Sequence, residues 1–121
     1  MGEVKSHRDL IVWQKSIRLA VIISELTKAF PAQERSLAEQ MKRSARSAHA
    51  NIAEGHGRAT RKDYLGFLAV ANGSLQETDS HLAEAIECWL IPRARGREAV
   101  ALLDEVSKML MVLRWRLKDK G

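Results

Sequence analysis

Apolar residues recur at spacings of three and four along four segments of this chain, which is the periodicity of an amphipathic α-helix. No segment shows the alternation of apolar and polar residues that is typical of a half-buried β-strand. Proline and glycine separate the segments, at Pro31, at Gly55 and Gly57, and at Pro92 and Gly96. The pattern predicts an all-α fold, an antiparallel up-down-up-down four-helix bundle, in a single domain over residues 1–121. We expect residues 1–8 to form a flexible N-terminal segment.

The first predicted helix, from about Asp9 to Ala29, is apolar on two opposite sides. Ser6 and Asp9 have the spacing of a capping box at its start. One stripe consists of Leu10, Trp13, Ile17, Ala20 and Val21, and the other of Val12, Leu19, Ile23 and Leu26. A helix that is apolar on most sides is buried on most sides, whereas each helix of a monomeric bundle keeps an outer face. We therefore expect copies of the chain to associate.

The other three helices each have one apolar face. The second should run from about Ala32 to Glu54, with Gly55 in the left-handed conformation just past its end. The third should begin at a second capping pair, Thr60 and Asp63, and the fourth should run from about Glu98 to Lys118. The core faces are, in order, Leu37, Met41, Ala45, Ala48 and Ile52; Tyr64, Phe67, Leu68, Ala71, Leu75, Thr78, Leu82, Ala85, Ile86 and Trp89; and Leu102, Leu103, Val106, Met109, Leu110, Leu113 and Leu117.

Charge is distributed unevenly along the chain, whose formal net charge is +5. Residues 35–62 hold seven Lys and Arg but two acids, whereas residues 63–90 hold five acids and no Lys or Arg. A segregated basic surface can recruit the phosphate backbone of a nucleic acid. The candidate nucleic-acid-binding residues are Lys42, Arg46, Arg58, Arg61 and Lys62. A second basic region consists of Arg114, Arg116, Lys118 and Lys120.

The same charges allow a second interpretation. Arg43 or Arg46 could pair with Glu77 or Glu84 on the acidic third helix. The chain would then be a structural or protein-interaction module, held by ion pairs between helices and between subunits, with no nucleic-acid binding. A weaker possibility is that the turn from Gly55 to Arg58, which leads into a helix N-terminus, holds an anion.

No arrangement of residues in the sequence indicates catalysis, so we expect no enzymatic activity, no cofactor and no metal. There is no G-x-S-x-G elbow, no phosphate-binding P-loop and no Glu-x-x-His motif of a di-iron bundle. Glu77, His81 and Glu84 could supply half of a metal site, but such a cluster is more often a solvated polar face. Cys88, the single cysteine, excludes an internal disulfide, fits a cytoplasmic location and is expected to be a buried, inert thiol. No apolar run is long enough for a membrane span.

Several short blocks together resemble the 23S rRNA intervening sequence proteins, a bacterial family. The blocks are Asp9-Leu10-Ile11-Val12-Trp13-Gln14, Phe30-Pro31-x-x-Glu34, Gln40-Met41-Lys42-Arg43-Ser44-Ala45, Asn51-Ile52-Ala53-Glu54-Gly55-x-Gly57-Arg58 and Phe67-Leu68-x-x-Ala71-x-Gly73-Ser74-Leu75-x-Glu77. The resemblance implies a helical bundle that associates into a ring-shaped homopentamer. It also implies kinship with the accessory variability determinant protein of diversity-generating retroelements, which binds a reverse transcriptase and nucleic acid through basic surfaces.

The sequence and the resemblance together predict a non-enzymatic oligomeric scaffold. We expect its basic surfaces to bind RNA or DNA, or a nucleoprotein partner, for which the resemblance suggests a reverse transcriptase. The phosphate contacts would be backbone-led and weakly specific for sequence, because aromatic residues do not alternate with the basic residues of the second helix.

Overall fold

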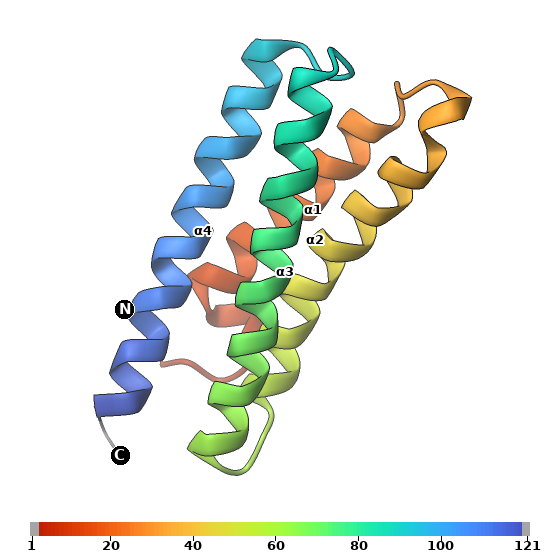
Figure 1. The fold of residues 1–121 in the computed structure, drawn as a ribbon. Helices are drawn as coiled ribbons and strands as arrows, with labels where there is room; N and C mark the ends of the chain where they lie inside the picture. The colour runs from red at the N-terminus through yellow and green to blue at the C-terminus, as the bar shows by residue number, and fades with distance from the viewer. Residues whose placement is uncertain (1–2, 120–121) are drawn as a thin grey trace.

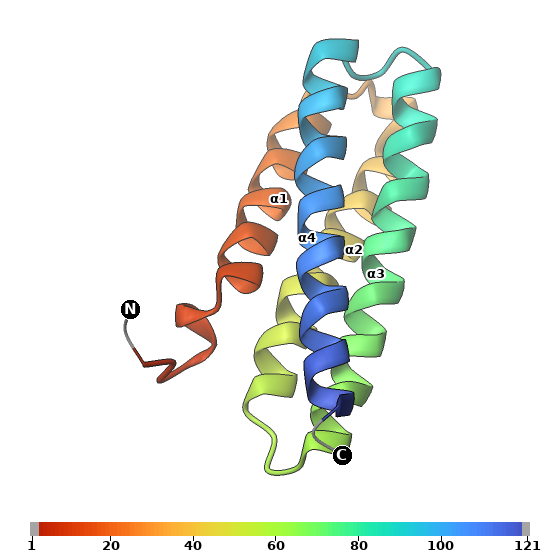
Figure 2. The same ribbon diagram turned by 90° about the vertical axis from the view of Figure 1, so that its left-hand side faces the viewer.

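The computed structural model describes residues 3–119, which form two short 3₁₀ turns and four α-helices. The elements are η1 (His7–Asp9), α1 (Ile11–Thr27), η2 (Ala32–Glu34), α2 (Arg35–His56), α3 (Arg61–Glu87) and α4 (Arg93–Asp119). Successive helices run antiparallel and lie side by side, and α1 and α4 also touch (Figures 1 and 2). The predicted all-α four-helix bundle is confirmed. Residues 1–2 of the expected flexible segment lie outside the described residues.

The N-terminal residues before α1 are held by a capping box, but this box caps η1 rather than α1. The Ser6 hydroxyl accepts a hydrogen bond from the Arg8 N–H, and the Asp9 carboxylate accepts from the N–H groups of Lys5 and Ser6. These two backbone donors hold the pKa of Asp9 below its ordinary value. Helix α1 therefore begins at Ile11, two residues later than expected, after an extended Leu10.

One of the two apolar stripes of α1 is the core stripe. Val12, Leu19, Ile23 and Leu26 are buried, and they pack with the predicted core faces of α2, α3 and α4. The opposite stripe is only partly covered by the chain itself. Its Leu10, Trp13, Ile17 and Ala20 are half-buried, and Val21 is 50% exposed.

Helices α2 and α3 make the most extensive helix contact in the bundle, and small polar residues line part of it. The hydroxyls of Ser47 and Ser74 share a hydrogen bond of 2.7 Å, and Thr78 Oγ1 donates to Ser44 Oγ over 2.8 Å. Because these buried and half-buried hydroxyls bond to one another, the two helices approach closely and the hydroxyls keep their hydrogen bonds.

Two glycines that the sequence placed at turns lie inside helices instead. Gly55 belongs to α2, and Gly96 belongs to the first turn of α4; no glycine among residues 3–119 has positive φ. A Cβ on Gly55 would stand 2.8 Å from Phe67 Cβ, and one on Gly96 would stand 2.7 Å from two side-chain atoms of Ile86. Both positions need glycine for close packing against α3 rather than for backbone freedom.

The start of α4 and the end of α3 differ from the sequence prediction. Helix α4 begins at Arg93 rather than Glu98, because the Pro92 carbonyl already accepts the Gly96 N–H at 2.9 Å. Proline needs no N–H at this position, so it starts the helix.

Helix α3 ends in a Schellman motif. The Leu90 N–H bonds to the Ala85 carbonyl and the Trp89 N–H to the Ile86 carbonyl. Trp89 therefore takes the left-handed position, at φ 61°, and is 75% exposed rather than part of the core seam. Ile91, two residues later, is buried in its place. Cys88 is exposed, so the expectation of a buried thiol is wrong.

Candidate nucleic-acid interface

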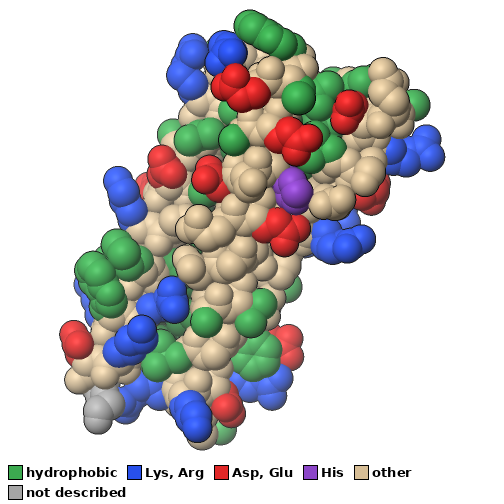
Figure 3. All heavy atoms as spheres, viewed as in Figure 1, with side chains coloured by type: hydrophobic (Ala, Val, Ile, Leu, Met, Phe, Trp, Pro, Cys, Tyr) green, Lys and Arg blue, Asp and Glu red, His purple; other side chains and the backbone are tan. Residues whose placement is uncertain are grey.

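Acidic and basic side chains gather at different ends of α3. In Figure 3 acidic side chains are frequent over the C-terminal half of this helix, the part in which Glu77 lies beside His81. Basic side chains are more frequent where α3 begins and α4 ends. The segregation of charge in the sequence is therefore also a segregation in space.

Lys42 and Arg46 lie on the exposed side of the middle of α2. Lys42 Nζ is 3.1 Å from the Glu39 carboxylate, and this pair holds the pKa of Glu39 below its ordinary value. Arg46 is exposed and makes no ion pair with any residue between 3 and 119. His49, on the same side, is half-buried; burial, and secondarily the Arg46 charge, lower its pKa. Because the imidazole is then neutral at pH 7, His49 adds no positive charge to this face.

Arg58 is engaged at the α2–α3 turn. Its guanidinium lies 2.9 Å from the Glu54 carboxylate and 4.6 Å from the centre of the Phe67 ring. The rings of His56 and Tyr64 meet edge to face next to it, and burial raises the pKa of Tyr64. These contacts brace the turn, so Arg58 would meet a phosphate only with its remaining donors.

The turn from Gly55 to Arg58 does not form an open anion cradle. The Gly57 N–H donates to the carbonyls of Ala53 and Glu54, and the Arg58 N–H donates to the Gly55 carbonyl. Backbone N–H groups that are used in this way cannot also point at an anion.

Arg61 and Lys62 face a different neighbour from the other three candidates. With Leu65, Leu117 and Lys118 they line a hollow of about 350 Å³ between the start of α3 and the end of α4. None of the three cations forms an ion pair with any residue in the described range 3–119. The fold thus joins part of the first basic region to the second, whose Lys120 lies outside the described residues.

The five candidates do not form one cluster. Arg46 lies ten residues before the end of α2, which is about 15 Å along the helix axis. The structure therefore presents two basic areas: one on the middle of α2, with Lys42, Arg43 and Arg46, and one at the end of the bundle, with Arg61, Lys62 and Lys118.

The ion pairs that the structural interpretation predicted within the chain are not formed. Among residues 3–119, neither Arg43 nor Arg46 lies within 4.0 Å of a carboxylate of Glu77 or Glu84. Glu77 instead lies 3.5 Å from His81 Nε2 on its own helix. Over the described range, no group of three or more His, Cys, Asp and Glu is placed to hold a metal ion.

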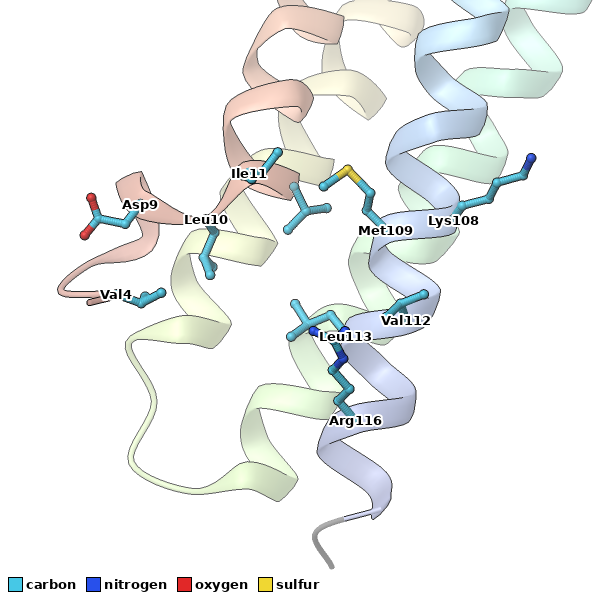
Figure 4. Close-up of a pocket in the computed structure, with 10 residues that line it drawn as sticks. Val4, Asp9, Leu10, Ile11, Lys108, Met109, Val112, Leu113 and Arg116 are labelled. Carbon is cyan, nitrogen blue, oxygen red and sulfur yellow. The ribbon is translucent and has the colours of Figure 1, made fainter. Parts of the chain in front are cut away.

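An apolar groove lies between the start of α1 and the C-terminal half of α4 (Figure 4). Its volume is about 630 Å³, and Leu10 and Ile11 face Met109 and Leu113 across it. Ile11 is 55% exposed and Val112, on its rim, is 38% exposed. Leu10, which lines the groove, belongs to the apolar stripe of α1 opposite the core stripe, for which the sequence predicted a partner. None of the helices in the described range is both long and apolar enough to cross a membrane.

Comparison with known proteins gives a family and a related fold. A sequence model described as 23S rRNA-intervening sequence protein matches residues 8–112. A crystal structure from Bacteroides thetaiotaomicron VPI-5482, described as a protein with unknown function from the S23 ribosomal protein family, is 29% identical to this chain. The similarity covers 86% of this chain and 98% of that one, with a TM-score of 0.78. No curated protein matches the chain.

Proposed function

We propose that this chain, which belongs to the 23S rRNA-intervening sequence protein family, is a non-enzymatic scaffold that binds nucleic acid through its basic areas. The observation that carries the proposal is that, over the described residues, three arginines of the basic areas form no ion pair with the acidic helix α3. Arg43, Arg46 and Arg61 are exposed and have no ion-pair partner among residues 3–119. Exposed cations of this kind neutralise phosphates and release counterions.

Salt dependence is the direct test. Filter binding of RNA and of DNA should show an affinity that falls by orders of magnitude between about 50 and 200 mM salt, because each neutralised phosphate releases counterions. Arg46→Gln should weaken binding and make the salt dependence shallower. Arg18→Gln is the matched control, since Arg18 is also exposed and unpaired within residues 3–119 but lies on α1. Absence of binding to both RNA and DNA at the lower salt would overturn the proposal.

A nucleoprotein partner would be held by the same basic areas. The resemblance suggests a reverse transcriptase, and a gene for this enzyme with a template repeat beside the gene for this chain would support that partner. An rRNA gene surrounding the chain's own gene would favour the intervening-sequence setting instead.

The apolar groove supports a second candidate role, self-association. Ile11, Val21 and Val112 leave apolar surface uncovered by the chain itself. We propose that copies of the chain bury this surface, and the family resemblance suggests five copies in a ring. If the association occurs without any nucleic-acid binding, the purely structural role is the correct one.

Sedimentation and light scattering test self-association. Val112→Glu should reduce the assembled mass, because it places a charge on an apolar interface. Val70→Glu is the control: Val70 is 53% exposed on α3 and does not line the groove. A strict monomer of the wild-type chain at micromolar concentration would refute this role.

A further inference from the structure

Helix α4, which supplies Leu117 and Lys118 to the hollow at the end of the bundle, also carries an exposed aromatic side chain. Trp115 stands three residues before Lys118 on this helix, so the two side chains are neighbours on its surface. The Trp115 side chain is 56% exposed, and it does not line the apolar groove. Figure 3 shows a cluster of apolar side chains beside basic ones over the lower half of α4.

Proteins that bind single-stranded nucleic acid combine cations with exposed aromatic rings, and both features are present here. Cations hold the backbone, and an unpaired base stacks on the ring regardless of its identity. A base inside a duplex offers no free face for such stacking. We propose that the end of the bundle binds a single-stranded segment of nucleic acid, with a phosphate at Arg61, Lys62 and Lys118 and a base stacked on Trp115. This inference rests on the proposed function.

The lining of the hollow agrees with this arrangement. Leu65 and Leu117 line it together with the cations and offer apolar surface to a sugar. Arg61 and Lys62 also lie in the first turn of α3, where the helix dipole adds positive potential. Two carboxylates lie close in sequence: Asp63, whose N–H bonds to Thr60, and Asp119. Neither forms an ion pair with the three cations within the described range.

Lys118 also has a role in helix stability, which the experiment must distinguish from contact with a phosphate. A cation in the last turn of a helix stabilises the negative end of the helix dipole. Lys28 is a suitable control because it occupies the C-cap position of α1 and is exposed. Trp89 is the control for Trp115: it is 75% exposed and has a neighbouring cation, Arg93, but lies at the opposite end of α4.

The experiment measures the affinity of the full chain for a mixed-sequence single-stranded RNA and for a blunt duplex. Trp115→Ala should weaken RNA binding about 5- to 150-fold, the equivalent of one stacked base, and leave duplex binding unchanged. Trp89→Ala should leave both unchanged. Lys118→Gln should reduce the slope of log affinity against log salt by about 0.7 for the single strand, and Lys28→Gln should not. Inorganic phosphate alone should not compete, since it lacks the sugar and base.

The outcomes separate this inference from the function on which it depends. If the wild-type chain binds no nucleic acid at low salt, both proposals fail. If the wild-type chain binds RNA but Trp115→Ala and Lys118→Gln behave as their controls do, the proposed function stands and the single-strand site is refuted. A Trp115→Ala variant with unchanged RNA affinity and altered sedimentation would assign Trp115 to self-association, and this also refutes the site.

Discussion

Replacing Gly55 with alanine should destabilise the bundle, although alanine is the better helix former. Gly55 lies in the last turn of α2, where the gain from alanine is smaller than the full value of roughly 0.5–1 kcal/mol. The new Cβ would stand 2.8 Å from Phe67 Cβ, 2.9 Å from Tyr64 Cδ1 and 3.3 Å from the Tyr64 carbonyl oxygen. Phe67 Cβ and the carbonyl are fixed to the backbone of α3, so relief requires the two helices to separate.

The cost of such overpacking is about 1–3 kcal/mol, which exceeds the gain in helix propensity. We expect a net loss of about 1–2 kcal/mol, or a fall in Tm of roughly 4–8 °C for a domain of this size. Thermal unfolding followed by circular dichroism at fixed protein concentration measures the change.

Gly73→Ala is the matched control. Gly73 lies inside α3, and a Cβ there would meet nothing within 4 Å. The same substitution should therefore raise Tm by roughly 2–4 °C, from helix propensity alone. If Gly55→Ala proves as stable as Gly73→Ala, the close approach of α2 and α3 is not what requires glycine, and the packing argument fails.

Three further predictions concern helix ends and titration. Trp89→Gly should be more stable than Trp89→Ala by about 1 kcal/mol in urea unfolding. An alanine at this left-handed position has a Cβ that clashes with the backbone, whereas glycine has none. Equal stabilities would contradict the Schellman assignment. Thr60→Ala should cost about 0.5–2 kcal/mol, since Thr60 Oγ1 accepts the Asp63 N–H at 3.1 Å, and Thr60→Ser should recover most of the loss. The pKa of His49 is below its ordinary 6.5, so the unfolded chain binds more protons and stability should fall as pH drops below 6.5. His49→Gln should flatten that slope in unfolding measured from pH 7 to about pH 5, and an unchanged slope would refute the assignment.

The helical faces of this chain can be predicted from its sequence, because burial follows the repeat of 3.6 residues per turn. The predicted core residues of α2, from Leu37 to Ile52, are all buried. Thr60 caps α3 as its spacing indicated. Of the apolar stripe of α1 that lies opposite the core stripe, Val21 is 50% exposed, whereas Leu10, Trp13, Ile17 and Ala20 are half-buried. Whether another copy covers that stripe stays a prediction.

Helix boundaries at the turns were predicted less well, for one physical reason. A glycine that permits a left-handed turn and a glycine that permits close helix packing look the same in a sequence. Gly55 and Gly96 are of the second kind, and only the positions of Phe67 and Ile86 on α3 show it. Trp89 takes the left-handed position because Leu90 and Ile91 turn toward the core, which is a property of the assembled bundle.

For the candidate site, the amino-acid sequence identifies the residues that carry positive charge and separates them from the acidic helix. The packing of the helices sets how those charges are grouped. Arg61 and Lys62 meet Lys118 because α3 and α4 run antiparallel, so the first turn of one lies beside the last turn of the other. Arg58, three residues before Arg61, turns instead toward Phe67 and Glu54. Residues that are distant in the chain become neighbours only through the register of two packed helices, and that register is set by side chains throughout the core rather than by the charged residues themselves.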